Sequence, residues 1–430
     1  MDEVRGIKVC EHGGVQISTV KCEHTKMTKK FANYVNLKHF KVARNNNDMI
    51  VGVDIGSTTL RALGAIYQED EKFPVVIATY KKILDGVDRG NITDSEEVTD
   101  AIVDAITTLE EESGHSTLHT LVSLGAVGLT SHHSNGHAQV SRGDASVTDL
   151  DIDNAIKDAN RGVPDIRNKA VVHTIPMKYK LDGNDIQGDI IGVRGNKLEV
   201  KTLFITYPLQ CMNVLKKVLD KGAIRVTDIV AGPVAESIPL LTKKQKVAGV
   251  ALINIGAGVT SLLVYENNIP LLVSTIPVGG DDITKDLAIG LKVTLEEAED
   301  IKCGRNKIVS VTRRVEEIIE ARLEDMCVKI NKELDRIHRR ELLPAGVVVC
   351  GSSSVVPRLE YIFRSELKLP IKITSNELVR LTNDTLRDTG WARVYGLTFL
   401  APRDTENDVL KELLTSIFTR VKKVITQFLP

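Results

Sequence analysis

The sequence has little that marks a secreted, membrane-spanning or nucleic-acid-binding protein. Its 56 Lys and Arg against 57 Asp and Glu give a formal net charge of −1, which provides no field to hold nucleic acid phosphates. It has no uninterrupted apolar run of about 18 residues, the length a membrane-spanning helix needs. The start of the chain is polar and mixed in charge, without the apolar segment of a secretory signal. These absences predict a soluble protein that binds no nucleic acid.

Cysteine is also scarce. The chain has 6 cysteines in 430 residues, none in a C-x-x-C pair, which is typical of reduced thiols inside the cell. The hydrophobic fraction of 42% and the charged fraction of 26% are ordinary for a folded protein. The length allows about two to four domains or subdomains.

Two copies of one strand–turn–strand pattern are present. The first spans 49–67 and turns at Asp54-Ile-Gly-Ser-Thr58, and the second spans 249–265 and turns at Asn254-Ile-Gly-Ala-Gly258. Asp54 and Asn254 hold the same place, 200 residues apart. A third apolar segment follows each copy, at 74–83 and at 269–276. The pattern predicts two three-stranded meanders.

The turns carry residues suited to phosphate. Glycine lets backbone N–H groups approach an anion closely, and Ser or Thr hydroxyls add donors. A carboxylate at the end of the first strand can orient a hydrated metal ion beside phosphates, which makes Asp54 the candidate catalytic and metal-binding residue. Either turn alone also fits an ordinary hairpin. The duplication favours a pair of turns that clamp a nucleotide polyphosphate.

A third element fits the same site. The segment 346–358 predicts a buried strand, a small-residue turn and the start of a helix. Gly351 and the serines after it allow the close backbone approach that a base or ribose needs. A β-to-α connection capped by serine is an equally good interpretation of this segment alone.

The order of these elements resembles the actin, DnaK and sugar-kinase superfamily, and within it the FtsA family of cell-division proteins, from 49 to about 400. The segments that carry the finer resemblance are 147–156, 172–183, 192–200, 277–290 and 295–302. The resemblance implies an α/β, actin-like fold of two lobes with mixed five-stranded sheets. It also implies an inserted small subdomain and a C-terminal amphipathic helix.

The resemblance also divides the chain. We expect an N-terminal extension, or a misassigned start, followed by interleaved parts of the two lobes. The expected parts are the extension 1–48, the first lobe 49–130, 212–244 and 377–403, the inserted subdomain 131–211, the second lobe 245–280 and 344–376, its outer subdomain 281–343, and a linker with the amphipathic helix at 404–430.

The resemblance implies ATP with Mg²⁺ between the lobes. The residues expected at the nucleotide are Gly56, Ser57, Thr58, Gly256, Gly258, Thr260, Glu299, Lys302, Gly351 and Ser352. Two positions differ from the residues that are usual in the superfamily. Asn254 stands where Asp is usual, and Gly232 stands where Glu is usual. Both departures remove a carboxylate that could organise water or the metal. We therefore expect ATP binding with weak or no hydrolysis.

The last segment has apolar residues at helical spacing and basic residues in its later half. One interpretation is a final helix packed on the protein's own core, and the other is a helix lying on an anionic membrane. The resemblance favours the membrane. The residues expected to bind it are Leu414, Phe418, Arg420, Lys422, Lys423 and Phe428. This predicts a peripheral protein on the cytoplasmic side of the cell membrane, at the division site.

The resemblance further implies partners: self-association into filaments, the C-terminal peptide of FtsZ, and later division proteins. The segment 316–340 predicts a charged helix over a core, and Arg313, Arg314 and Lys329 are candidate contacts for an acidic peptide. Two alternatives are a PilM-like adaptor of type IV pilus assembly and a kinase of the same superfamily. The tail favours FtsA over the adaptor, and the missing carboxylates disfavour the kinase.

One polar segment contains three histidines, His132, His133 and His137. A metal site needs converging ligands at about 2 Å. We expect a solvated loop here instead, because the residues that follow the first two histidines are small and polar.

Overall fold

The computed structural model describes two compact units, Met1–Ala43 and Arg44–Pro430. The residues that it describes are 5–9, 15–19, 48–68, 71, 73–186, 188–305, 313–374, 377–382 and 385–402. In the first unit, β1 (Arg5–Val9) pairs with β2 (Val15–Thr19) as an antiparallel hairpin. The second unit contains the remaining described elements. The predicted amphipathic helix and most of the N-terminal extension lie outside the described residues.

The first lobe is built on a five-stranded sheet with the order β13-β8-β3-β4-β5. Its strands are β3 (Asp48–Ile55), β4 (Thr59–Ile66), β5 (Val75–Ile83), β8 (Ser116–Leu124) and β13 (Val226–Ala231). The first predicted meander is confirmed, because β3, β4 and β5 pair antiparallel in sequence. The sheet is mixed, since β8 runs parallel to both β3 and β13. A short hairpin, β6 (Val87–Asp88) and β7 (Asn91–Ile92), follows β5.

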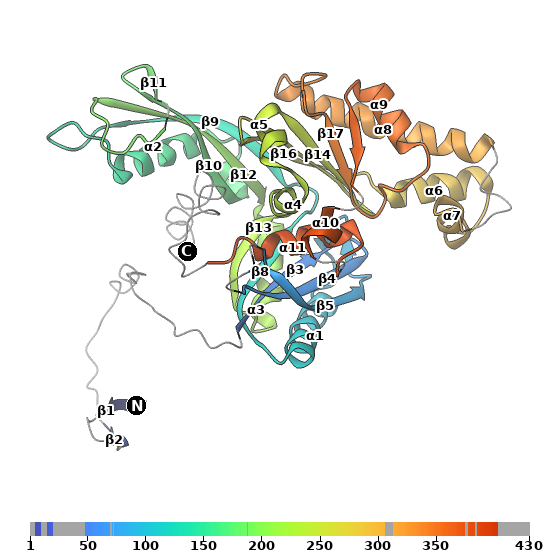
Figure 1. Cartoon of the computed structure of the whole chain (residues 1–430), viewed down its shortest axis with the longest axis horizontal. Coiled ribbons are helices and arrows are strands. Elements are labelled where there is room, and N and C mark those ends of the chain that lie inside the picture. The colour runs from blue at the N-terminus through green and yellow to red at the C-terminus, as the bar shows by residue number, and fades with distance from the viewer. Residues whose placement is uncertain are drawn as a thin grey trace. The chain divides into compact units, whose positions relative to one another are not determined.

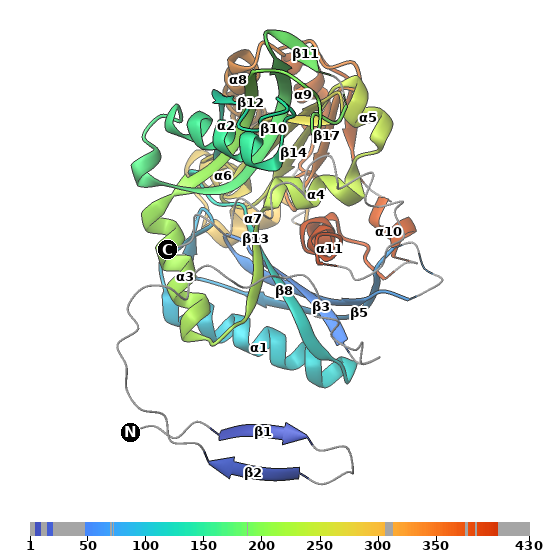
Figure 2. The same cartoon turned by 90° about the vertical axis from the view of Figure 1, so that its left-hand side faces the viewer.

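Helices cover both faces of this sheet (Figure 2). On one face lie α1 (Ser95–Ser113) and α3 (Leu209–Lys221), and on the other lie α4 (Gly232–Leu240), α10 (Glu377–Leu381) and α11 (Ala392–Thr398). Helix α1 begins where the Asp94 side chain accepts hydrogen bonds from the N–H groups of Glu96 and Glu97, and it ends at Gly114 with φ of 66°. The lobe thus has a helix–sheet–helix arrangement that buries nearly all of β3.

The second lobe repeats the meander. Its strands are β14 (Val250–Ile255), β15 (Thr260–Glu266), β16 (Ile269–Ile276), β17 (Val347–Cys350) and β18 (Ile371–Ile373). The antiparallel pairing of β14, β15 and β16 confirms the second prediction, while β17 and β18 add parallel strands beside β14. Its helices are α5 (Lys243–Ala248), α6 (Gly280–Leu291), α7 (Leu295–Lys302), α8 (Arg313–Arg336) and α9 (Leu359–Leu367), and α8 is the charged helix that was predicted. Figure 1 shows α6–α9 at the far end of this lobe.

The inserted subdomain adds β9 (Thr130–Gln139), α2 (Asp149–Arg161), β10 (Lys169–Leu181), β11 (Asn184–Ile186) and β12 (Lys197–Pro208). Strand β9 meets β16 at Thr130 and Ser274, so the sheet of the second lobe continues into the insert and has nine strands. Helix α2 begins with a side-chain cap, in which Asp151 accepts from the Thr148 N–H at 2.8 Å. Of the segment 192–200 that carries the resemblance, only the part from Lys197 onward belongs to a strand, β12.

The histidine-rich segment is a strand, so the prediction of a solvated loop was wrong. Strand β9 pairs along its whole length with β12. This pairing stabilises the strand, although the polar residues of β9 have little preference for strands. Gly136 faces α2 so closely that a Cβ there would collide with the Ala155 carbonyl. Pairing with β12 and packing against α2 therefore stabilise a strand that the residue types alone do not predict.

Candidate functional site: two facing glycine turns and a buried arginine

The two glycine-rich turns lie opposite one another, at the ends of β3 and β14. A Cβ added to Gly258 would lie 3.0 Å from the Ser57 Oγ, so the turns are in contact. Both turns close in the same way, because the Gly56 N–H bonds to the Thr59 carbonyl at 3.1 Å and the Gly256 N–H to the Val259 carbonyl at 2.9 Å. The sequence repeat thus corresponds to a pair of facing turns.

The start of α6 packs directly behind the second turn. The Gly280 N–H bonds to the Gly256 carbonyl, and the Asp281 N–H bonds to the Ala257 carbonyl, both at 2.9 Å. A Cβ at Gly279 would collide with that same Ala257 carbonyl. Only glycine therefore allows this helix start to approach the turn.

The third loop joins the end of β14. Gly351 has φ of 97°, and a Cβ there would lie 2.5 Å from the Ile255 carbonyl and 2.6 Å from the Asn254 Oδ1. The Ser353 N–H donates to the Ile255 carbonyl at 3.0 Å. Ser352, in contrast, is exposed. The structure thus brings the third loop beside the second turn, as an adenosine-binding role requires.

Two predicted residues on α7, Glu299 and Lys302, contact the start of α6. The Lys302 Nζ lies 2.6 Å from the Glu299 Oε2 and donates to the Thr284 hydroxyl at 2.9 Å and to the Gly280 carbonyl at 3.2 Å. Burial opposes ionisation of Glu299, but the hydrogen bonds from Lys302 and Thr284 hold its pKa below the ordinary value. These two side chains stand beside the third loop, because a Cβ at Gly280 would collide with Ser353.

The two predicted threonines differ in their availability. Thr58 is exposed at the tip of the first turn. Thr260 is buried at the start of β15, and its hydroxyl donates to the Val278 carbonyl at 2.8 Å. Of the two threonines, only Thr58 is therefore exposed to solvent.

Asp54 lies in a buried charged network that the sequence did not reveal. Its Oδ1 accepts a hydrogen bond from Ser123, and the Arg393 Nη1 lies 3.3 Å away. The Nε of the same arginine is 3.2 Å from Glu236, which is completely buried. The Cys350 Sγ donates to the other oxygen of Glu236 at 2.7 Å. Arg393 therefore pairs with one carboxylate from β3 and one from α4.

Two glycines leave room for this arginine. A Cβ at Gly125 would lie 2.5 Å from the Arg393 Nη1, and a Cβ at Gly232 would lie 2.8 Å from its Cδ and Nε. Gly232 is the position where the superfamily usually has Glu. Burial opposes the charge of Arg393, but Asp54 and Glu236 outweigh it and raise its pKa. Burial, with a smaller contribution from Glu236, also raises the pKa of the Cys350 thiol well above its usual value.

These donors do not fit a magnesium ion. Mg²⁺ is bound in proteins through one or two carboxylates with water and phosphate. Asp54 is already paired, and Asn254 carries no charge. Across the described part of the chain, no group of three or more His, Cys, Asp or Glu could hold a metal.

Two cavities border the site. One, of about 280 Å³ with open solvent included, lies beside the two turns and is lined by Ser57, Val87, Asp88, Arg89, Gly258, Asp281, Asp282 and Lys285. Arg89 crosses it, contacting the Pro277 carbonyl and lying 3.3 Å from Asp282. Arg89 therefore links the hairpin β6–β7 to the start of α6.

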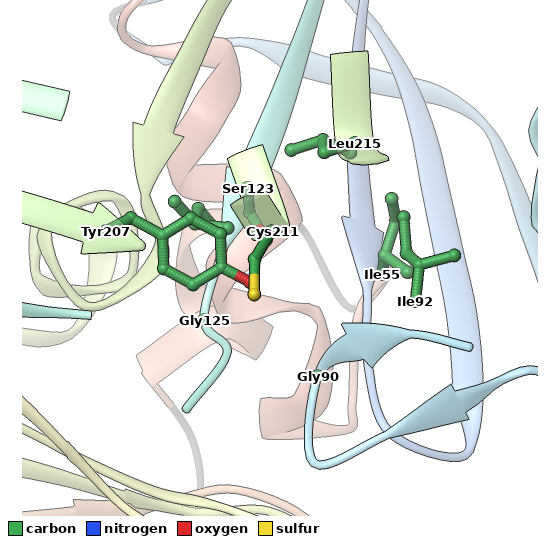
Figure 3. Close-up of a pocket in the computed structure, with 9 residues that line it drawn as sticks. Ile55, Gly90, Ile92, Ser123, Gly125, Tyr207, Cys211 and Leu215 are labelled. Carbon is green, nitrogen blue, oxygen red and sulfur yellow. The ribbon is translucent and has the colours of Figure 1, made fainter. Parts of the chain in front are cut away.

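The other cavity lies between α3 and the end of β3 (Figure 3). The Tyr207 hydroxyl and the Cys211 sulfur point toward one another there, and burial is the main cause that raises the pKa of Tyr207. The free volume is about 20 Å³, which is room for about one water molecule. This cavity is too small for a nucleotide.

Comparison with known proteins agrees with the resemblance. A family model described as "Cell division protein FtsA" matches residues 251–396, and one described as "SHS2 domain inserted in FTSA" matches residues 128–206. The cell division protein FtsA of Bacillus subtilis is 27% identical over 353 residues, covering 77% of this chain and 79% of that protein. The FtsA of Pseudomonas aeruginosa is 26% identical over 380 residues, covering 81% and 89%. The chain belongs to the FtsA family.

The solved structures agree on the fold. A structure titled "PilM-PilN type IV pilus biogenesis complex" matches with a TM-score of 0.61 at 16% identity, covering 82% of this chain and 99% of that one. At that identity the likeness shows the fold alone. This member of the FtsA family therefore has the actin-like, two-lobed α/β fold that was predicted, with the FtsA-type insertion.

The predicted contacts for an FtsZ peptide are spread along α8. Arg313 and Arg314 are exposed at its start, where the Arg313 Nε lies 2.9 Å from Glu317. Lys329 contacts Asp325 and lies about 24 Å further along the helix, at 1.5 Å per residue. The structure does not bring Lys329 together with the two arginines.

The predicted membrane-binding residues, Leu414 to Phe428, lie outside the described residues. Within the described part, no helix is long and apolar enough to cross a bilayer.

Proposed function

We propose that this chain is an actin-like cell-division protein that binds ATP, polymerises and attaches to the inner face of the cytoplasmic membrane. There it tethers FtsZ and recruits later division proteins. The observation that carries the proposal is the contact between Ser57 of the first turn and Gly258 of the second, at the ends of two matching meanders. Membership of the FtsA family supports the same role.

ATP fits the arrangement of backbone donors. The turn 56–58 and the turn 256–258 would take the phosphates, while Glu299 and Lys302 on one side and Gly351 with Ser352 on the other would take the ribose and base. Glycine-rich turns at strand ends are suited to anions because a glycine has no side chain to shield the neighbouring N–H groups. The N–H groups of Gly56 and Gly256 themselves close the turns, so the phosphates would be bound by the other N–H groups of the two turns. The bound nucleotide would hold the two lobes in a fixed orientation relative to one another. We propose little or no hydrolysis, because no unpaired carboxylate stands at either strand end.

Attachment would come from the tail. Replacing Phe418 and Phe428 by Asp should release the protein from anionic vesicles, because apolar burial and basic residues each contribute to interfacial binding. A tail variant with Thr415→Ser is the matched control. Unchanged co-sedimentation of the double Asp variant would refute membrane attachment through the tail.

The decisive experiment is sedimentation with anionic vesicles, with and without ATP. It compares the full chain with a version that ends at Pro402, and electron microscopy of the pellets detects filaments. We expect the full chain to pellet with vesicles and to form filaments with ATP. We expect the shortened version to stay in the supernatant.

FtsZ tethering is tested separately, with a peptide of the FtsZ C-terminus. Charge reversal of Arg313 and Arg314 should weaken peptide binding, while reversal of Lys329 alone should weaken it less, since Lys329 lies far along α8 from the two arginines. Full binding after all three reversals would remove these residues from the interface.

A pilus-assembly adaptor is the second candidate, because the fold matches the PilM–PilN complex over most of both chains. The FtsA family match and the amphipathic tail favour cell division. An adaptor would depend on a membrane partner's peptide, so binding of the purified chain to bare vesicles separates the two functions.

A further inference from the structure

We propose that the guanidinium of Arg393 permanently takes the place of the divalent cation in this cleft, so that the chain binds metal-free ATP. This inference rests on the proposed ATP binding. Its ligand class is a nucleoside polyphosphate without a bound metal ion. The affinity for that ligand should then be independent of Mg²⁺.

The position of the guanidinium carries the proposal. Arg393 reaches from α11 to the end of β3, where it lies 3.3 Å from Asp54. It also lies 3.2 Å from Glu236 on α4. Asp54 is the one residue that the sequence offers as a metal ligand beside the phosphate turns. A positive group already stands against it.

The charge of Arg393 opposes a metal ion at Asp54. A divalent cation at Asp54 would stand a few ångströms from a buried guanidinium, where like charges repel strongly because the surroundings are of low dielectric constant. The arginine side chain is 12% exposed, and the side chains of Asp54 and Glu236 are 6% and 1% exposed. Removing such a group from its partners is costly, so a metal ion does not readily displace it.

The fold holds the guanidinium in place through α11. Gly52 of β3 lies so close that its added Cβ would be 2.6 Å from the Val394 carbonyl. A Cβ at Gly396 would collide with the Ala235 carbonyl of α4. Helix α11 is thus packed backbone to backbone on both sides, and Arg393 projects from it into the space that Gly125 and Gly232 leave open.

The other strand end offers no substitute site. Asn254 can donate and accept hydrogen bonds but supplies no charge for Mg²⁺. Its amide oxygen lies against Gly351, as the close approach there shows. The end of β14 therefore supplies no carboxylate to a metal ion.

The first test measures ATP affinity of the full chain by equilibrium dialysis, in about 5-fold excess of either Mg²⁺ or EDTA over ATP. We expect the two dissociation constants to agree within about twofold. A more than tenfold weaker affinity in EDTA overturns the inference. If ATP binds under neither condition, the proposed function is refuted instead. The inference is then decided by the second test, which adds the metal ion without nucleotide.

The second test measures melting temperature with MgCl₂ or MnCl₂ and no nucleotide. The unchanged chain should show no shift that EDTA reverses, whereas Arg393→Met should gain about 2–4 °C, because Asp54 and Glu236 then lack a cation. Arg61→Met is the control, since Arg61 pairs at 3.8 Å with Asp388, which is half exposed.

Each result of the second test supports or overturns the inference. An EDTA-reversible shift in the unchanged chain that Asp54→Asn abolishes overturns it, and so does a folded Arg393→Met that gains no shift. If Arg393→Met does not fold, the unchanged chain and Asp54→Asn are sufficient to decide between the two outcomes.

Discussion

The two meanders share a register and differ in charge. Asp54 faces Arg61 across the first hairpin, and Asn254 faces Ser261 across the second. Both turns close through the same glycine hydrogen bond. The second hairpin therefore folds without a charged residue at the end of its first strand. The Asp54 carboxylate of the first hairpin is thus not needed to form the turn, and it pairs with Arg393 instead.

A second difference lies in the middle of the first strand. Gly52 of β3 corresponds to Leu252 of β14. The backbone of α11 lies against Gly52, whereas Leu252 is 1% exposed and packs in the main core. The same strand position thus packs against a helix backbone in the first lobe and carries a buried side chain in the second.

The largest expected effect concerns the charged end. Arg393→Ala should lower the free energy of unfolding by about 3–5 kcal/mol, because it leaves two buried carboxylates without their cation. Urea denaturation measures it. Arg313→Ala removes an exposed pair and should change stability by at most about 1 kcal/mol. A loss at Arg393 no larger than that at Arg313 would mean that the network contributes nothing to the first lobe.

The corresponding positions 52 and 252 should respond to opposite changes in size. Leu252→Ala opens a cavity and should cost about 2–5 kcal/mol. Gly52→Ala forces its Cβ into the Val394 carbonyl and should cost about 1–3 kcal/mol, because α11 must shift. Urea denaturation of both variants tests this. A neutral or stabilising Gly52→Ala would show that α11 is not seated on β3.

The sequence predicted both meanders because their apolar alternation and glycine turns are local signals. It could not place Arg393, which comes near Asp54 only when α11 returns to the first lobe. A signal was nevertheless present. Arg393 and Glu236 are single charges inside otherwise apolar segments, and a charge in such a segment needs a buried partner.

The histidine-rich strand was missed for a related reason. The pairing of β9 depends on β12, which lies far along the chain, and on the fit of α2 against Gly136. Strand preference is strongly dependent on such neighbours. The glycines of the turns are stronger local signals, because a Cβ at Gly56 or Gly256 would crowd a carbonyl of its own turn. Their role at a nucleotide stays a prediction.

A third test concerns the opposite end of the second meander. Lys246 lies with its Nζ 4.8 Å from the centre of the Tyr265 ring and 3.4 Å from the Ser237 Oγ, and the first meander has the small Ala65 at the place of Tyr265. Burial lowers the pKa of Lys246 to about 8. The unfolded chain therefore binds more protons than the folded chain above pH 8, so this group makes stability rise with pH up to its unfolded pKa, near 10.5.

Lys246→Met should remove that contribution. Relative to the variant, the unchanged chain should gain about 2 kcal/mol of unfolding free energy between about pH 8 and pH 10. Urea denaturation across this range measures the difference, with the exposed Lys243→Met as control. Parallel pH profiles for the unchanged chain and Lys246→Met would contradict the buried, deprotonating lysine.

The smallest effect concerns the contact that holds the two turns together. Arg89 of the first lobe lies 3.3 Å from Asp282 of the second, and the two side chains are 36% and 15% exposed. Arg89→Ala should change the unfolding free energy by at most about 1 kcal/mol, because the pair is partly solvated. The same loss, acting on closure of the lobes, should speed ATP dissociation up to about fivefold in a stopped-flow chase. Lys82→Ala is the control: its cation is exposed to a similar degree, at 39%, but its partner Asp104 is 59% exposed and lies in the same lobe at 2.8 Å. Equal dissociation rates for the two variants would mean that Arg89 does not hold the lobes closed, and the Ser57–Gly258 contact would then be maintained by the turns themselves.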